Sequence, residues 1–530
     1  MSQPRDREFG PLRSFFWPVH RHELRKLMPM VLILFLICFN YTVLRNMKDS
    51  VVVTASGAEV IPFIKVWVLL PMAVLLTWLF TKMSNRFSQE RVFYIMILGF
   101  LGFFALFGFV LYPLRDSLHP AELATHMEQV LPAGFKGLIA MCCNWTFTIF
   151  YVMCELWGSA ILSVLFWGFA NEVTKLTEAS RFYGVFGVGA NVSTILAGQV
   201  ALFLSPARLS DFGILTGHDA WERTMMVLLS IVIVSGLGAI ALFRWMSQNV
   251  LRDKSFDEFH HTAKELKKKK NKLSMRESFS YLSNSKYLLC IAVIVLAYNL
   301  VINLVEVVWK DQLARLYPSP SDYNDYMNYL STAIGIVATV GALFMSRLIK
   351  MLGWTGTALI TPILMLITCV GFFSFLFFQD HWAGPFMAIA GTSPLAIAVF
   401  FGAAQNCLSK AAKYSVFDAT KEMAFIPLGH ESKLKGKAAI DGVGSRLGKS
   451  GGSLIHQGLL MGFSTVSASA GYVAFILMGC IVLWMFATRS LGKQFMTLTT
   501  GSPETTPENS NSEASWKGTE TAKNAISASA

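Results

Sequence analysis

Long runs of uncharged, mostly apolar residues constrain this chain more than any other feature of its sequence. Residues 92–112, VFYIMILGFLGFFALFGFVLY, contain no charged side chain. About twenty such residues in a helix cross a hydrocarbon layer of about 30 Å. Only 15% of the 530 residues are charged, whereas soluble domains carry about 25%. The sequence therefore predicts an all-α polytopic membrane protein.

Runs of this kind recur about twelve times along the chain, each long enough for one membrane span. They lie near residues 28–46, 59–81, 92–112, 138–171, 183–205, 224–245, 287–309, 327–348, 355–378, 385–407, 436–463 and 470–488. The run at 138–171 is too long for one straight crossing. We expect it to be tilted, broken near Gly158 or extended beyond the bilayer.

Lysine and arginine residues are frequent in every second connection between these runs, which indicates how the chain is oriented. The richest connection contains KELKKKKNKL (264–273), between the sixth and seventh runs. Because basic loops stay on the cytoplasmic side, we expect an even number of spans and both termini in the cytoplasm. The lysines at 267–270 are then a topology anchor on an anionic lipid surface, and we expect no nucleic-acid partner.

Six runs, a basic segment and six more runs indicate two equivalent halves. FGVGANVSTILAGQ (186–199) resembles DGVGSRLGKSGGSLIHQ (441–457), and RNMKDS (45–50) resembles VVWKDQ (307–312) at a corresponding place. Many secondary transporters consist of paired halves with the substrate site between them. The predicted parts are a basic amino-terminal segment 1–27, a first half 28–246, a basic cytoplasmic loop 247–286, a second half 287–495 and a disordered tail 496–530.

The glycine-rich stretch GVGSRLGKSGG (442–452) carries a Lys-Ser pair, as phosphate-binding loops do. The Walker pattern G-x-x-x-x-G-K-[ST] is not satisfied, because Val443 stands where the first glycine is required. Small residues inside a membrane helix more often serve close helix packing. With no metal-ligand cluster such as H-E-x-x-H either, we expect no enzymatic activity, no cofactor and no metal site.

Four charged residues lie inside apolar runs, where a charge costs about 2.5–3.5 kcal/mol on insertion scales. They are Lys65, Glu155, Glu306 and Lys449, one base and one acid in each half, and Arg446 shares a helix face with Lys449. For Glu306 and Lys449, nearer the ends of their runs, structural pairing is an equal alternative. Cations between two halves suit an anionic substrate. A lysine that exchanges a carboxylate for a phosphate would let the carrier reorient only when loaded.

Several longer stretches resemble the nucleotide transporters, or ATP/ADP translocases, of plastids and obligate intracellular bacteria. They are NYTVLRNMKDSVVVTA (40–55), EVIPFIKVWV (59–68), FYVMCELWGS (150–159), VLFWGFANEVT (164–174), INLVEVVWK (302–310), KAAKYSVFD (410–418), DATKEMAFIPL (418–428) and KGKAAIDGVGSRLGKSGG (435–452). The resemblance implies a fold of the major facilitator type. It also implies exchange of external ATP for internal ADP without hydrolysis, with phosphate as a candidate companion of ADP.

The resemblance implies that the bases and acids at Lys65, Glu155, Glu306 and Lys449 matter for transport. We expect Lys65 and Lys449, helped by Arg446, to bind the phosphates through charge-assisted hydrogen bonds. Glu155 and Glu306 are expected to pair with these bases when no substrate is bound.

Two further sets of residues are assigned with a structural alternative beside them. Tyr151, Phe186 and Asn191 are candidates for an adenine slot, for which ordinary packing is the stronger alternative. Lys48, Lys310 and Lys421 lie close to the ends of apolar runs, and we interpret them as gate or topology charges.

A proton-coupled net importer of a broader range of nucleoside triphosphates is the alternative function. In that case Glu155 or Glu306 would be the proton carrier. We find no removable signal or plastid transit peptide, so we expect a multi-pass protein of a bacterial inner membrane. The expected partners are ATP, ADP and the lipid bilayer, and the expected oligomeric state is a monomer.

Overall fold

The computed structural model describes residues 19–174, 176–206, 219–250, 285–378, 391–428, 436–437, 440 and 444–500. Every regular element within these ranges is a helix. Eleven of the described helices are long and apolar enough to cross a membrane. The expected run at 436–463 corresponds to a further helix, α22 (Ser445–Phe463), whose first turns are polar and rich in glycine. The prediction of an all-α polytopic membrane protein is confirmed.

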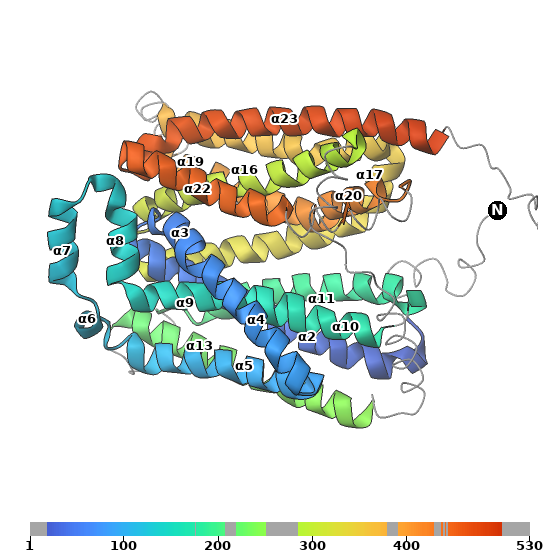
Figure 1. Ribbon diagram of the computed structural model, residues 1–530, viewed down its shortest axis with the longest axis horizontal. Coiled ribbons are helices and arrows are strands. Elements are labelled where there is room, and N and C mark those ends of the chain that lie inside the picture. Colours follow the sequence, from blue (N-terminus) through green and yellow to red (C-terminus); the bar gives the residue numbers. More distant parts are fainter. Residues whose placement is uncertain are drawn as a thin grey trace, which may run out of the picture.

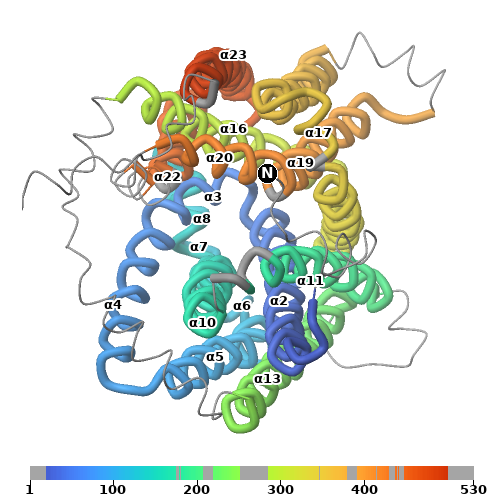
Figure 2. Tube along the Cα trace, turned by 90° about the vertical axis from the view of Figure 1, so that its right-hand side faces the viewer, coloured from blue at the N-terminus to red at the C-terminus, as the bar shows by residue number. Residues whose placement is uncertain are grey.

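Two groups of helices form the molecule, one above the other in Figure 1. The first group, from blue to green, lies in the lower part of Figures 1 and 2. It consists of α2 (Leu24–Ser56), α3 (Val60–Phe63), η3 (Ile64–Leu69), α4 (Leu70–Arg86), α5 (Gln89–Leu106), η4 (Phe107–Leu111), α6 (Arg115–Leu118), α7 (Ala121–Val130), α8 (Lys136–Cys143), α9 (Trp145–Leu156), η6 (Trp157–Phe166), α10 (Trp167–Val173), α11 (Leu176–Phe203) and α13 (Ala220–Asn249).

The second group, from yellow-green to red, lies in the upper part of both views. It consists of α16 (Lys286–Leu316), α17 (Pro320–Phe377), α19 (Pro394–Ala412), η7 (Lys413–Phe417), α20 (Asp418–Ala424), α22 and α23 (Val466–Thr500). Helix α17 contains two candidate spans, because Gly353 interrupts it with φ 66° and ψ −179°. The lysine run at 264–273 and the tail from 501 onward lie outside the described residues.

The long apolar run at 138–171 departs from regular α-helix geometry at two points. Asn144 separates α8 from α9 with φ −90° and ψ 48°. Near Gly158 the chain stays helical but changes to π geometry, beginning at Trp157. A Cβ atom on Gly158 would lie 2.5 Å from a ring carbon of Tyr41 on α2, so only glycine fits there. The break expected near Gly158 is therefore a change of helical geometry beside a close helix contact.

The two halves contact each other along three lines. Helix α11 packs on α17, α2 packs on α16 and α17, and α22 packs on α3 and η3. A Cβ on Gly198 would lie 2.7 Å from the carbonyl oxygen of Asn328, and one on Gly335 would lie 2.9 Å from that of Asn191. Small residues at these positions let the backbones of α11 and α17 approach closely.

The described part of the glycine-rich stretch, residues 444–452, leads into α22, which packs on α16. A Cβ on Gly448 would lie 2.8 Å from Cβ of Asn299, and one on Gly452 would lie 3.0 Å from Cβ of Asn303. Close packing of α22 on α16 therefore accounts for glycine at these two positions.

Another glycine at a helix contact gives a stability prediction. A Cβ on Gly402 of α19 would lie 2.1 Å from Cδ1 of Trp309, which is 1% exposed and donates its indole N–H to the Val399 carbonyl at 3.0 Å. Because the ring has no room to move, we expect Gly402→Ala to lower the free energy of unfolding by about 1–3 kcal/mol. Thermal unfolding in detergent measures this change.

The matched control is Gly458→Ala, the same substitution on α22, where a Cβ would meet nothing within 4 Å. Alanine favours a helix relative to glycine, so this control should unfold at the wild-type temperature or slightly above it. Equal midpoints for the two variants would contradict the overpacking at Gly402.

Candidate functional site

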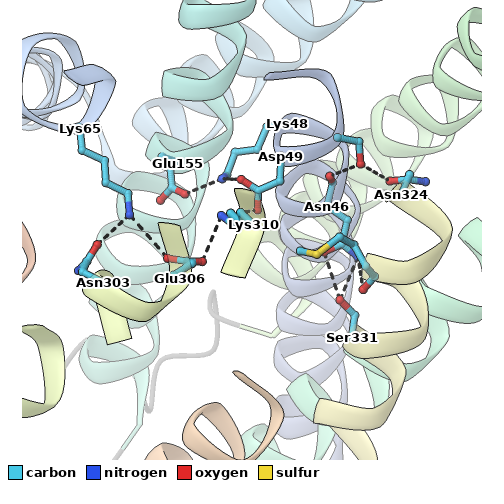
Figure 3. Close-up of polar contacts among 12 residues, drawn as sticks. Asn46, Lys48, Asp49, Lys65, Glu155, Asn303, Glu306, Lys310, Asn324 and Ser331 are labelled. Carbon is cyan, nitrogen blue, oxygen red and sulfur yellow. Dashed lines mark hydrogen bonds and ion pairs between the residues drawn. The ribbon is translucent and has the colours of Figure 1, made fainter. Parts of the chain in front are cut away.

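Three lysines and three carboxylates form a continuous network between the two halves (Figure 3). Lys48 Nζ lies 2.7 Å from Asp49 Oδ1 and 3.0 Å from Glu155 Oε1. Lys310 Nζ lies 2.9 Å from Asp49 Oδ2 and 3.2 Å from Glu306 Oε1. Lys65 Nζ lies 3.6 Å from Glu306 Oε2 and donates to Asn303 Oδ1 at 2.8 Å. The order along the network is Glu155, Lys48, Asp49, Lys310, Glu306 and Lys65.

The centre of this network is buried and its ends are partly exposed. The side chains of Lys48, Asp49 and Lys310 are 1–2% exposed. Those of Lys65, Glu306 and Glu155 are 18%, 21% and 27% exposed. An incoming anion can therefore reach the outer members first, while the central triad stays covered.

Helical spacing explains how these side chains come together. On α16, Asn303, Glu306 and Lys310 are separated by three and four residues and share one face. On α9, Tyr151 lies one turn before Glu155, and Lys48 Nζ stands 3.8 Å from the centre of the Tyr151 ring. The π-helical segment η3 carries Lys65. Such segments occur often at functional sites.

Two ion pairs of the network join the halves. Of the other three, two lie within the first half and one lies within the second. Lys310 of α16 contacts Asp49 of α2, and Glu306 of α16 contacts Lys65 of η3. The three positive and three negative side chains balance, so the network carries no net charge. Its cross-half pairs can stabilise one relative position of the halves without a large field of either sign.

A second, uncharged set of contacts joins α2 to α17 beside the network (Figure 3). Asn46 Nδ2 donates to Asn328 Oδ1 at 2.7 Å, to Ser331 Oγ at 2.9 Å and to the Met327 carbonyl at 3.3 Å. One turn along α2, Ser50 Oγ lies 3.4 Å from Asn324 Oδ1. Asn46 and these α17 side chains are buried, so this seam is a specific polar contact between the halves.

Comparisons with known proteins identify the family. A family model described as TLC ATP/ADP transporter matches residues 2–495. This chain belongs to that family. The resemblance inferred from the sequence motifs is confirmed, and the chain is a multi-pass membrane transporter.

Individual relatives and solved structures agree with this family. The transporter is 46% identical over 499 residues to ADP,ATP carrier protein 1 of Chlamydia pneumoniae, covering 94% of this chain and 96% of that one. It is 44% identical over 477 residues to ADP,ATP carrier protein 2, chloroplastic, of Arabidopsis thaliana, covering 90% and 75%. In fold it is similar to a bacterial homologue of the iron transporter ferroportin in an inward-facing state, with TM-score 0.54, 13% identity and coverage of 89% and 99%. This likeness supports the predicted major-facilitator-like fold.

Of the four charges inferred from the sequence of the transporter, three lie in the network. Lys65 and Glu306 pair with each other, whereas Glu155 pairs with Lys48. Lys449 on α22 is exposed and has no ion-pair partner within the described residues. Arg446 lies in α22, but its side chain lies outside the described part of the chain.

Lys48 and Lys310 do not lie where the sequence placed them. We interpreted both as gate or topology charges close to the membrane ends, because the apolar runs stop at 46 and 309. The helices continue to Ser56 and Leu316, so both lysines lie inside them at the buried centre of the network. Lys421 lies apart from the network on α20, 3.7 Å from Glu422.

The three adenine candidates are not brought together. Tyr151 is fully buried beneath Lys48. Phe186 is also fully buried, within 5.7–6.0 Å of the rings of Phe166, Tyr183 and Trp167. Asn191 on α11 is half-buried. In this conformation, therefore, neither aromatic ring offers a free face to a base.

The sequence interpretation missed Asp49 and Asn303. Asp49 forms ion pairs with both central lysines, and Asn303 accepts a hydrogen bond from Lys65. The signal for Asp49 was the repeated Lys-Asp pair of RNMKDS and VVWKDQ. In the structure, the two repeated lysines share Asp49, whereas the second aspartate, Asp311, contacts Gln312, Arg315 and Ser467 instead.

Proposed function

We propose that this transporter exchanges external ATP for internal ADP across a bacterial inner membrane by alternating access. The observation that carries the proposal is 46% identity, over 94% of the chain, to a protein named an ADP,ATP carrier. The charge network supports it, because its outer lysine, Lys65, reaches the exposed edge of a contact between the halves. We further propose that no hydrolysis occurs, that phosphate can accompany ADP and that the protein works as a monomer.

The orientation and the extent of the two halves belong to this proposal. The alternation of basic loops supports cytoplasmic termini and an even number of spans. We propose 28–246 and 287–495 as the halves that move relative to each other, joined by the basic loop 247–286.

Substrate phosphates are proposed to act by replacing Glu306 as the partner of Lys65. The contact of Lys65 with Glu306, at 3.6 Å, is the longest of the five ion pairs in the network. A phosphate oxygen that takes the place of Glu306 leaves that carboxylate on Lys310, at 3.2 Å. One cross-half pair is then broken by the nucleotide itself. A ligand shifts a conformational equilibrium only through such a difference in affinity between two states.

The remaining site residues are proposed from the same geometry. Lys449, with Arg446, is proposed to hold the phosphates from the second half. Glu155 is proposed to keep Lys48 in place when no nucleotide is bound. Asn191, half-buried on α11, is the adenine candidate open to a base in this conformation.

Counterflow into reconstituted vesicles tests the proposed function. Vesicles are loaded with ADP, with GTP or with nothing, and ATP labelled in both the adenine and the γ-phosphate is added outside. We expect uptake only with ADP inside, no effect of a pH gradient and an unchanged ratio of the two labels. Proton-driven uptake into empty vesicles would assign the protein to net import, and a changed label ratio would indicate hydrolysis.

A further inference from the structure

The neutral network leaves the charge of a nucleotide unbalanced. Lys48, Lys65 and Lys310 are matched by Asp49, Glu155 and Glu306. A nucleoside triphosphate carries about four negative charges at neutral pH, as expected for phosphate groups with a second pKa near 6. If nucleotide binding releases only Lys65, most of that charge needs cations from outside the network. The site therefore requires further basic residues.

Two lysines of the second half meet this requirement. Lys449 of α22 and Lys410 of α19 have no ion-pair partner within the described residues, and Lys410 is half-buried. The charges that act most strongly on Lys410 are those of Arg45, Glu306, Lys310 and Asp49. Those that act most strongly on Lys449 are Lys413, Glu155, Lys65 and Glu306. Both lysines are therefore within electrostatic range of the network, and Glu306 acts on both.

Local backbone geometry also sets the position of Lys410 apart. It lies in the last turn of α19, directly before the π-helical segment η7, which begins at Lys413. Two of the six network charges lie in or beside π segments as well: Lys65 lies within η3, and Glu155 lies two residues before η6. Because π segments occur often at functional sites, this recurrence favours a role in binding.

Other lysines in the same part of the chain behave differently. Lys421 and Lys437 both contact Glu422, at 3.7 Å and 2.5 Å. A lysine that pairs with a nearby acid in this way is suited to fixing the orientation of the chain at the cytoplasmic surface. Lys410 is instead repelled by the positive charges of Arg45 and Lys310, and it has no ion-pair partner of its own within the described residues. A bound anion would relieve that repulsion.

We propose that Lys410 is a phosphate-binding residue that lets the carrier distinguish nucleotides by the number of their phosphates. Lys410 contributes a positive charge from α19, as Lys449 does from α22 and Lys65 does from η3. Its charge favours triphosphate over diphosphate and diphosphate over monophosphate. This proposal rests on the proposed exchange function and adds to it a residue to which the sequence analysis assigned no role.

Competition binding tests Lys410 directly. Unlabelled ATP, ADP and AMP displace labelled ATP from purified wild-type protein, Lys410→Gln, Lys410→Arg and Lys350→Gln. We expect Lys410→Gln to raise the Kd of ATP about tenfold, equivalent to ~1.4 kcal/mol. The Kd of ADP should rise less and that of AMP little. Lys410→Arg should retain the wild-type order. Lys350, an exposed lysine of the same half, is the matched control and should change nothing.

Equal losses for the three nucleotides, or no loss, would overturn the proposal, because a purely structural role does not depend on phosphate number. If Lys410→Gln fails to fold, the wild-type protein answers the question through protection from an amine-reactive label. ATP should protect Lys410 and adenosine should not; labelling that ATP leaves unchanged rules the proposal out. Failure of the proposed exchange function can be distinguished from failure of the Lys410 proposal. The first would appear in counterflow with the wild-type protein, whereas the second depends only on what the Lys410 variants bind.

Discussion

Replacing Asp49 with asparagine should both destabilise the protein and reduce exchange to background. Asp49 accepts a hydrogen bond from Lys48 at 2.7 Å and forms an ion pair with Lys310 at 2.9 Å, and all three side chains are almost completely buried. Asparagine fits the space but removes the anion between two buried cations, which keep only Glu155 and Glu306 as partners. Leaving a buried charge with no partner costs about 3–5 kcal/mol, and we expect a loss below that range because each lysine keeps one carboxylate. Thermal unfolding in detergent and counterflow with ADP-loaded vesicles measure the two effects.

The control for this variant makes the same chemical change at an exposed site. The side chain of Asp116 is 90% exposed and lies 3.9 Å from Arg115, so Asp116→Asn should behave as wild type. Asp49→Glu keeps the charge and should retain part of the activity. Wild-type stability and exchange in Asp49→Asn would show that the lysines find other partners and that the network is not needed.

Replacing Lys65 with alanine should abolish exchange and leave the fold intact. Lys65 is 18% exposed, and after its removal Glu306 still contacts Lys310 at 3.2 Å. No fully buried charge loses its last partner, so we expect a change in unfolding free energy of no more than about 1 kcal/mol. Uptake should fall to background because the phosphate ligand of the first half is gone.

A binding measurement separates this loss from misfolding. ATP should raise the unfolding temperature of the wild-type protein, since a ligand of the native state stabilises it. The same addition should have little effect on Lys65→Ala. Lys82→Ala, an exposed lysine at the end of the neighbouring helix α4, is the matched control and should keep both uptake and the ATP effect. Wild-type uptake by a properly inserted Lys65→Ala protein would remove Lys65 from the site.

The contrast between these variants shows which parts of the site the sequence could reveal. Lys65, Glu155 and Glu306 stand out because each interrupts an apolar run, where a charge is costly. Lys48 and Lys310 lie just beyond such runs, and an apolar run does not show that its helix continues for several residues. Asp49 and Lys410 were visible only as members of motifs, since pairing across two halves depends on tertiary contacts.

The fold was easier to predict than the partners of the charges. Membrane thickness fixes the length of each span, so composition alone locates most helices. Helix α22 is the exception, because glycines that pack against Asn299 and Asn303 replace apolar side chains in its first turns. Phe186 shows the opposite case. It was an adenine candidate with ordinary packing as the stronger alternative, and in the structure neighbouring rings cover it.

The balance of charge in the network also determines how the membrane voltage acts on the carrier. Moving one elementary charge through 100 mV takes about 2.3 kcal/mol. The first half contributes two lysines and two carboxylates to the network and the second half one of each, so moving either share through the field does no net electrical work. The voltage then acts on the nucleotide and on Lys410 and Lys449, which have no ion-pair partner within the described residues. The sum of the nucleotide charge and these two lysine charges, rather than the six charges of the network, would set how strongly the resting potential of the cell drives each half of the transport cycle.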